Sequence, residues 1–151
     1  MQEPEPIIKR EYPDGPVVGV GAVIIIDDKV LLIKRGKEPG YGSWSIPGGA
    51  VHLGEKLSHA VEREILEETG LIVRCGEMVK VYEPVIRDQE GKVQFHYVLI
   101  DFLCEYVSGE PRPSSDILDA VLVSPAELKK YGLFKATADL IDKCLRIKGL
   151  V

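Results

Sequence analysis

Three glutamates occur at a spacing that places them on one face of a helix. Glu64, Glu67 and Glu68 stand at positions i, i+3 and i+4 of the segment 57–69, and residues at these spacings are neighbours on a helical surface. Three like charges this close repel one another, so the cluster costs stability unless a positive charge lies among them. Mg²⁺ suits this position, because it binds through a few carboxylates together with waters and substrate phosphates. The spacing therefore predicts a divalent-metal site for phosphate chemistry.

The residues around the glutamates complete a known pattern. The stretch from Gly49 to Leu71 resembles the signature of the Nudix hydrolases, G-x5-E-x7-R-E-U-x-E-E-x-G-U, in which U is aliphatic. The matching residues are Gly49, Glu55, Arg63, Glu64, Ile65, Glu67, Glu68, Gly70 and Leu71. The segments 43–49 and 97–102 are most similar to those of microbial ADP-ribose pyrophosphatases.

The resemblance implies a role for each charged residue of this box. Glu67 and Glu68 would be the main metal ligands, and Glu64 would share that role or act as the general base. Arg63 would orient and partly neutralise the cluster, since its planar fork suits paired carboxylates. Glu55 would lock the preceding loop onto the helix or bind the metal through water. The implied cofactor is Mg²⁺, for which Mn²⁺ can substitute.

The general base has two candidates. A carboxylate accepts the proton of an attacking water only if it is not itself a tight metal ligand, because a nearby cation keeps it ionised. Glu64 is one candidate. Asp116 in the polar loop 110–116 is the other candidate, and Glu110 in the same loop ranks after it. Asp116 has an alternative interpretation as an ordinary loop residue without a catalytic role. The resemblance also implies that Gly48 offers a backbone carbonyl to the metal.

A nucleotide substrate needs a surface for its base, and stacking of a base on an aromatic ring contributes roughly 1–3 kcal/mol. Trp44, with Tyr41 nearby, either anchors the core or lines a base pocket. Phe95, Tyr97 and Tyr82 compete for the same role. Phe95 and Tyr97 are two apart and share one face of a strand. Arg35 and its basic neighbours meet the substrate phosphates or only solvate a turn.

Hydrophobic spacing indicates which elements position these residues. Leu57, Ala60, Val61 and Ile65 form the apolar stripe of a helix over 57–69, and Gly70 is suited to end it. The loop 35–48 holds four glycines and two prolines, and a loop of this length usually has a function. The other expected elements are strands at 17–26, 30–34, 77–86, 93–106 and 120–123, an edge strand around Ile7–Arg10, a short helix capped by Ser124, and a helix at 135–148.

This order of elements predicts an α/β (α+β) sandwich with a mixed sheet, which is also the Nudix-type α/β/α sandwich that the resemblance implies. We expect an N-terminal arm or edge strand at 1–16 and a single Nudix hydrolase domain at 17–151. A chain of 151 residues with 45% hydrophobic content is sufficient for one core.

The amino-acid composition limits which binding partners and which compartment we expect for the protein. The net charge of −5 gives no broad basic face for nucleic acid. The apolar run 17–26 is too short to span a bilayer, and the opening Met-Gln-Glu-Pro-Glu-Pro lacks the features of a signal peptide. Three widely spaced cysteines are typical of free thiols in a reducing compartment. We therefore expect a cytoplasmic protein with a small nucleotide as its substrate, no nucleic-acid or membrane partner, and possible homodimers.

The predicted reaction is Mg²⁺-dependent hydrolysis of a nucleoside diphosphate linked to another moiety, with ADP-ribose cleaved to AMP and ribose 5-phosphate. One alternative is a pyrophosphohydrolase that removes nucleoside triphosphates, including oxidised ones. An alternative of another class is a non-catalytic Nudix module that binds a nucleotide. Loss of box glutamates would favour the binding module, and none is lost in this sequence.

Overall fold

The computed structural model of the protein describes residues 8–114 and 116–151. These residues form nine strands, two α-helices and one 3₁₀-helix. In chain order they are β1 (Val17–Ile26), β2 (Lys29–Arg35), β3 (Trp44–Ser45), β4 (Gly48–Ala50), α1 (Leu57–Thr69), β5 (Ile72–Arg74), β6 (Met78–Tyr82), β7 (Val85–Arg87), β8 (Val93–Ser108), β9 (Ile117–Val123), η1 (Pro125–Tyr131) and α2 (Lys135–Ile147).

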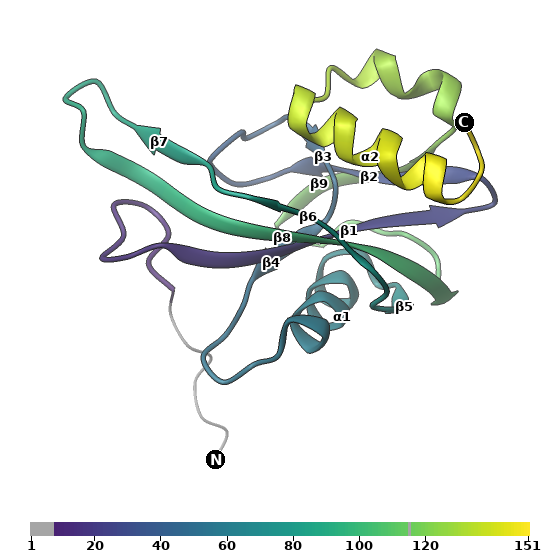
Figure 1. The fold of residues 1–151 in the computed structure, drawn as a ribbon, viewed down its shortest axis with the longest axis horizontal. Coiled ribbons are helices and arrows are strands. Elements are labelled where there is room, and N and C mark those ends of the chain that lie inside the picture. Colours follow the sequence, from purple (N-terminus) through teal and green to yellow (C-terminus); the bar gives the residue numbers. More distant parts are fainter. Residues whose placement is uncertain (1–7, 115) are drawn as a thin grey trace.

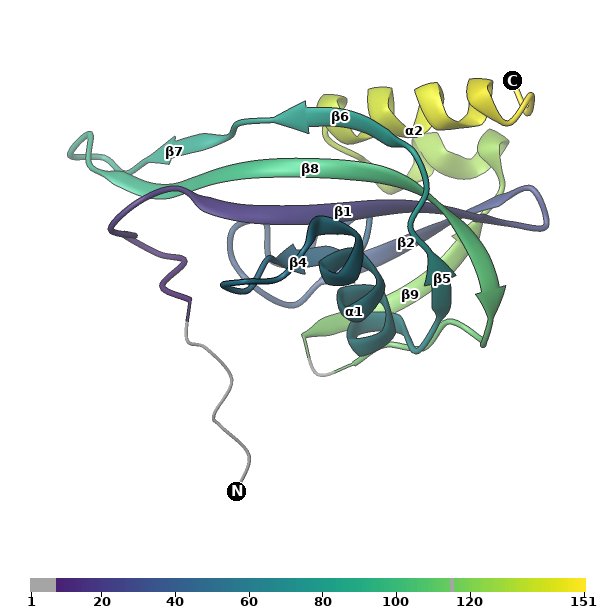
Figure 2. The same cartoon turned by 60° about the horizontal axis from the view of Figure 1, so that its bottom comes forward.

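The strands form a mixed sheet around β1 and β8. These two strands run parallel, with Gly19 opposite Leu99 and Gly21 opposite Asp101. The other pairings are antiparallel: β4 and β2 pair with β1, β3 and β9 pair with β2, and β5, β6 and β7 pair with β8. Helix α1 covers one face, and α2 with η1 covers the other (Figures 1 and 2). The predicted α/β/α sandwich is confirmed.

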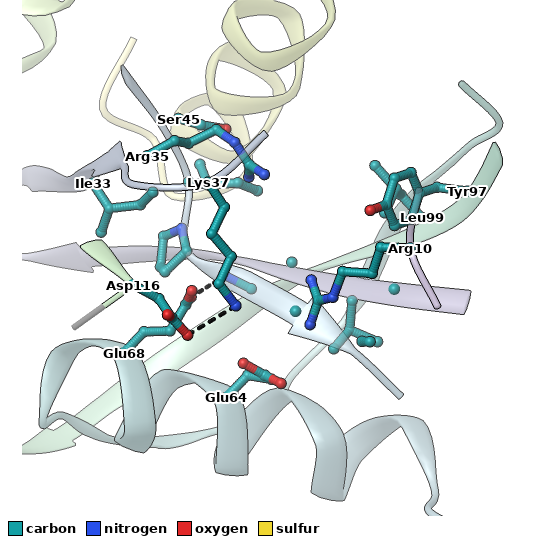
Figure 3. A pocket seen from close by; sticks show the side chains of 18 of the residues that line it. Arg10, Ile33, Arg35, Lys37, Ser45, Glu64, Glu68, Tyr97, Leu99 and Asp116 are labelled. Atoms are coloured by element: carbon teal, nitrogen blue, oxygen red, sulfur yellow. Dashed lines mark hydrogen bonds and ion pairs between the residues drawn. The ribbon is translucent and has the colours of Figure 1, made fainter. Parts of the chain in front are cut away.

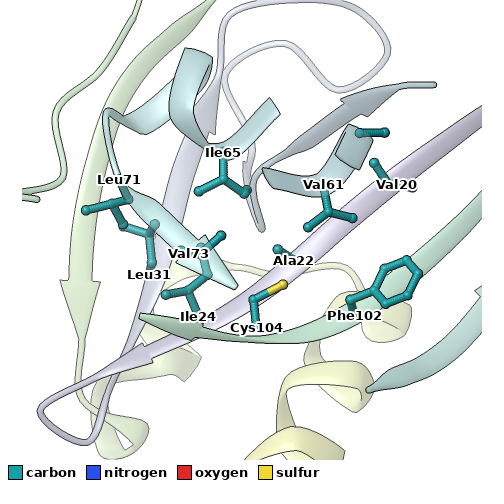
Figure 4. Packing of buried hydrophobic residues seen from close by; sticks show 11 residues of the cluster. Val20, Ala22, Ile24, Leu31, Val61, Ile65, Leu71, Val73, Phe102 and Cys104 are labelled. Carbon is teal, nitrogen blue, oxygen red and sulfur yellow. The ribbon is translucent and has the colours of Figure 1, made fainter. Parts of the chain in front are cut away.

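Alternation along β1 builds a core on each face of the sheet, because successive side chains of a strand point to opposite faces. Ala22 and Ile24 pack against Val61 and Ile65 of α1 (Figure 4). Val23 points the other way and belongs to the cluster under α2, whose buried members on that helix are Leu140, Ile141, Cys144 and Leu145. Both helices are therefore fixed by apolar packing.

Helix α1 has the predicted bounds, and its two ends differ in chemistry. Lys56 stands at the N-cap position and makes no side-chain capping bond. At the other end Gly70 adopts the left-handed conformation, with φ of 76°, and donates its N–H to the Leu66 carbonyl. Glycine takes this conformation without the strain that a Cβ would introduce. The prediction that Gly70 ends the helix is confirmed.

Several predicted elements are corrected by the structure. The expected strand 77–86 is two strands, β6 and β7, separated by Glu83 and Pro84, and a proline lacks the N–H that a sheet ladder needs. The loop 35–48 contains the short strand β3 and leads into β4. Residues 8–10 are not in a strand, and Ile7 lies outside the described residues.

The short element after Ser124 also differs from the expected capped helix. It is a 3₁₀-helix, and the Ser124 side chain makes no capping hydrogen bond. Instead, the backbone carbonyl of Ser124 accepts the N–H of Glu127. The last strand begins earlier than predicted, at Ile117, because it pairs with β2 along most of that strand. In the described parts of the chain, no helix has the length and apolar character needed to cross a membrane.

Candidate functional site

A cavity of about 480 Å³ lies at the edge where α1 faces β4. Its walls come from α1, β1, β4, β8, the segment 35–39 and the N-terminal arm. Figure 3 shows Glu64 and Glu68 rising from α1 towards Lys37 and Arg35 on the opposite wall. The charged residues and the histidine that line the cavity are Arg10, Arg35, Lys37, His52, Arg63, Glu64, Glu67, Glu68, Asp101 and Asp116.

Arg63 organises the acidic side of this cavity. Its Nε and Nη2 bind the two oxygens of Glu55 at 2.6 and 2.9 Å. Its Nη1 donates to Glu64 at 2.9 Å and to Glu67 at 3.1 Å, and Nη2 also donates to the Ala50 carbonyl at 3.0 Å. A guanidinium has five N–H donors in a fixed fork, and all five are used. A lysine could not reproduce this arrangement, because its three donors radiate from one atom.

Glu55 connects the loop before α1 to that helix. Besides its two bonds from Arg63, it accepts the backbone N–H of His52 at 3.0 Å. The hydrogen bonds from Arg63 lower the pKa of Glu55 to about 2, against a smaller opposing effect of burial. The side chain is not part of the cavity wall in the described residues. This geometry favours the loop-locking role over the metal-binding role for Glu55.

Glu64 is packed against the backbone of β4. Its side chain is only 8% exposed, and a Cβ at Gly49 would collide with the Glu64 carboxylate. The glycine that begins the sequence box is therefore required by close approach, since any other residue would displace this glutamate. Burial raises the pKa of Glu64, and the positive charges of Arg63 and Arg10 oppose that rise. Glu64 is thus a desolvated carboxylate that a nearby cation would stabilise as the anion.

Glu68 lies one helical turn further along α1. Its Oε1 accepts the backbone N–H of Gly48 at 2.7 Å. Burial raises the pKa of Glu68 to about 7; the Gly48 hydrogen bond lowers it and the charge of Glu64 raises it further. The structure therefore shows the amide of Gly48 in contact with a box glutamate. The carbonyl role that the sequence predicts for Gly48 stays a prediction.

The three glutamates suit a hard divalent cation, although their carboxylates do not converge on one point in this structure. Across residues 8–114 and 116–151, no three His, Cys, Asp or Glu side chains converge to hold a metal ion, and Arg63 occupies an oxygen each of Glu64 and Glu67. The three glutamates nevertheless line one cavity, and their mutual repulsion contributes to the raised pKa values of Glu64 and Glu68. Carboxylate oxygens that face one cavity are ligands that Mg²⁺ takes, together with waters and substrate phosphates.

Basic residues form the wall opposite the glutamates. Arg35 lines the cavity, and its Nε donates to the Pro39 carbonyl at 2.8 Å. Lys37 forms an ion pair with Asp116 at 3.0 Å. Asp116 therefore does reach the cavity, as its candidacy for the general base requires, but its side chain is 50% exposed and already paired. Acidic and basic walls facing each other suit a metal-bound phosphate chain between them.

The structure separates the five aromatic candidates. Tyr97 lines the cavity. Within the described residues, the cavity wall does not include the other four. Trp44 packs edge-to-face on Tyr131, with ring centroids 5.1 Å apart, which favours its interpretation as a core anchor. Tyr41 and Tyr82 are exposed, and Phe95 is buried and stacked on Tyr97 at 6.4 Å. Tyr97 is thus the aromatic residue that a base or sugar in this cavity would meet.

Sequence reasoning missed several residues of the cavity. Asp101 continues the alternation of Tyr97 and Leu99 along β8, so the period of a strand could have identified it. It is only 9% exposed, and burial raises its pKa to about 6. Arg10 comes from the N-terminal arm, and no sequence pattern places it here. His52 also lines the cavity, although its position inside the box is a variable one.

The chain belongs to the NUDIX domain family, whose model matches residues 15–144. The matched range includes the segment Gly49–Leu71, which carries the sequence resemblance and supplies the acidic side of the cavity. The acidic face of α1 and Arg63 therefore lie within the part of the chain that the family model matches.

Two curated relatives and one solved structure indicate the range of similarity. An ADP-ribose pyrophosphatase of Methanocaldococcus jannaschii is 40% identical over 105 residues, 70% of this chain and 60% of that relative's length. The nucleoside triphosphatase NudI of Escherichia coli K12 is 32% identical over 132 residues, 83% of this chain and 91% of NudI. The MutT NUDIX hydrolase from Burkholderia pseudomallei superposes with a TM-score of 0.69 at 32% identity, covering 85% of this chain and 98% of that one.

Proposed function

We propose that this protein is a divalent-metal-dependent diphosphatase that hydrolyses ADP-ribose to AMP and ribose 5-phosphate. The observation that carries the proposal is the pairing of a carboxylate face on α1 with a basic wall across one cavity. The similarity to the Methanocaldococcus ADP-ribose pyrophosphatase supports the choice of substrate. Tyr97 and the alternating residues of β8 supply the surface for the nucleoside.

In this mechanism Glu67 and Glu68 would hold Mg²⁺, with Glu64 as a further ligand or as the base. The bound ion would neutralise phosphate oxygens and activate a water. Arg63 keeps Glu55, Glu64 and Glu67 oriented through four of its hydrogen bonds, and the Gly48 N–H holds Glu68. The water attacks one phosphorus, the bridging P–O bond breaks, and the carboxylate base takes the proton of the water.

A triphosphate pyrophosphohydrolase is the second candidate. The 32% identity to NudI over 83% of this chain favours it. The same metal site would serve both reactions, because each breaks a P–O bond within a metal-bound phosphate chain. A non-catalytic nucleotide-binding module is disfavoured, since every box carboxylate is present: Arg63 holds Glu55, Glu64 and Glu67, and the Gly48 N–H holds Glu68.

The substrate proposal is tested by a panel under equal Mg²⁺. We expect kcat/KM to be highest for ADP-ribose, compared with other ADP-sugars, diadenosine polyphosphates, ordinary triphosphates and 8-oxo-dGTP, with AMP and ribose 5-phosphate identified by chromatography. A preference of about tenfold for a triphosphate, equivalent to about 1.4 kcal/mol of differential transition-state binding, would move the protein to the second candidate.

Metal removal gives a separate prediction. Millimolar Mg²⁺ should raise the melting temperature. Binding to the native state at a hundredfold excess over Kd stabilises that state by about 2.7 kcal/mol. This free energy corresponds to a rise in melting temperature of roughly 5–10 °C for a chain of this size. EDTA should abolish both the shift and the hydrolysis. Glu67→Gln should reduce the shift.

A matched control for that melt is Glu62→Gln. Glu62 is also on α1, but its carboxylate accepts the backbone N–H of Cys75 and does not belong to the cavity wall of the described residues. Its Mg²⁺ shift should equal that of the wild type. Wild-type activity that survives EDTA would contradict the metal assignment.

A further inference from the structure

The N-terminal arm is attached to the hairpin formed by β7 and β8. Tyr12 donates its backbone N–H to the Gln94 carbonyl at 2.7 Å and its hydroxyl to Asp88 at 2.8 Å. Lys92 lies 4.9 Å from the centre of the Tyr12 ring. One residue earlier, Glu11 accepts a bond from the Gln94 side chain at 2.8 Å. Four contacts from two consecutive arm residues therefore fix the arm beside the hairpin, where Figure 1 shows it before β1.

Tyr12 adopts a backbone conformation that a bulky residue rarely takes. Its φ is 48°, in the left-handed region, where a side chain is strained. Such a residue persists only where surrounding contacts over-determine it, and it is found preferentially at functional sites. The hydrogen bonds to Gln94 and Asp88 are the contacts that hold Tyr12 there. The chain bends at Glu11 and Tyr12, and this bend has a consequence for the residue just before it.

That consequence is the placement of Arg10. Arg10 lines the cavity together with Ile8, Tyr97 and Leu99. Figure 3 shows its guanidinium directed to the middle of the cavity, between Tyr97 and Glu64. In the described parts of the chain, Arg10 has no ion pair within 4.0 Å. Its fork of donors is therefore available to a ligand, and it faces the cavity from the arm rather than from the basic wall of residues 35–37.

We propose that Arg10 is a substrate-binding residue that pairs with a phosphate of the diphosphate, and that Tyr12 is the positioning residue that aims it. The inference rests on the proposed function in one respect: the ligand is a nucleoside phosphate with at least two phosphates. A guanidinium binds phosphate oxygens in a bidentate manner, which suits a planar fork held at a fixed angle. Arg10 and Arg35 would hold the phosphate chain from two sides while the glutamates hold the metal.

Direct titration of ADP in the presence of Mg²⁺ tests the role of Arg10 without relying on hydrolysis. Arg10→Ala should weaken ADP binding by about ten- to a hundredfold, as expected for a charge-assisted contact. Arg10→Lys should give an intermediate loss, because it keeps the charge and loses the fork. Lys9→Ala is the matched control, since Lys9 is exposed and pairs only loosely with Asp14 at 3.9 Å. Equal affinities in wild type and both Arg10 variants, or an equal loss in Lys9→Ala, would overturn the assignment.

A double-mutant cycle tests the positioning role of Tyr12. Tyr12→Ala should weaken ADP binding by about tenfold in the wild type and have little effect in the Arg10→Ala background, because the two residues act as one unit. If Tyr12 contributed only to stability, Tyr12→Ala would weaken ADP binding by the same factor in the wild type and in the Arg10→Ala variant. These binding measurements are independent of the substrate panel. A preference for triphosphates in that panel would change the proposed function, whereas the ADP titrations would still decide the role of Arg10.

Discussion

Glu68→Gln should lower kcat by about 10²–10³-fold, because it removes a negative charge that holds the cation stabilising the transition state. The same substitution should not lower the melting temperature in EDTA, and we expect it to raise it. Burial holds the pKa of Glu68 at about 7, so the ionised side chain is unfavourable in the folded, metal-free protein. Glutamine keeps the oxygen that accepts the Gly48 N–H and removes the charge.

The pH dependence provides an internal check on this prediction. The pKa of Glu68 rises from 4.5 to about 7 on folding, so the folded protein holds its proton to a higher pH than the unfolded chain. Its contribution to metal-free stability is therefore greatest below pH 4.5 and is lost as the pH rises towards 7. Thermal melts in EDTA across that window should show a smaller decline for Glu68→Gln than for the wild type. A variant that melts lower at pH 7 and keeps full kcat would contradict both parts.

The acidic face could be predicted because the chemistry is local in the sequence. Glu64, Glu67 and Glu68 are brought together by helical periodicity alone, and the bounds of α1 follow from its apolar stripe and from Gly70. Gly49 and Glu55 are also within the same segment, and the structure shows a physical reason for each. Gly49 admits the Glu64 carboxylate, and Glu55 holds Arg63.

The opposite side of the cavity could not be predicted in the same way, because it is assembled by tertiary contacts. Trp44 is close to the box in sequence, but β3 pairs with β2 and turns the ring towards Tyr131. Arg10 is distant from the box and reaches the cavity because the arm docks on the β7–β8 hairpin. Local sequence carries little information on such placements, so the sequence alone could not decide between the two interpretations of Trp44 or choose among the other aromatic candidates.

The strands were predictable where apolar and β-branched residues form a long run, and misjudged where a proline interrupts such a run. The strand Val93–Ser108 is such a run, and 93–106 of it was expected. The segment 77–86 reads as continuous by composition, yet Pro84 cannot donate to the ladder, so the chain pairs with β8 in two pieces. The break places Pro84 and Ile86 at the cavity wall, and the irregularity thereby contributes to the site.

The general base should be identified by a pair of single substitutions, and we expect Glu64→Gln to lower kcat by about 10²–10⁴-fold and Asp116→Asn by less than about tenfold. Glu64 is buried against β4, and only one of its oxygens is engaged by Arg63. Asp116 is half exposed, and Lys37 holds one of its oxygens at 3.0 Å. Single-turnover rates under saturating Mg²⁺ would measure the chemical step directly.

Metal occupancy must be separated from proton transfer in this comparison, because Glu64 is also a candidate ligand. If Glu64→Gln keeps the Mg²⁺-induced rise in melting temperature and loses the chemical step, the residue acts as the base; if it loses both, it acts as a ligand. A larger loss in Asp116→Asn would assign the base to the loop before β9. Losses below about tenfold in both variants would make general-base catalysis by either residue untenable, since that contribution is typically 10²–10⁴-fold.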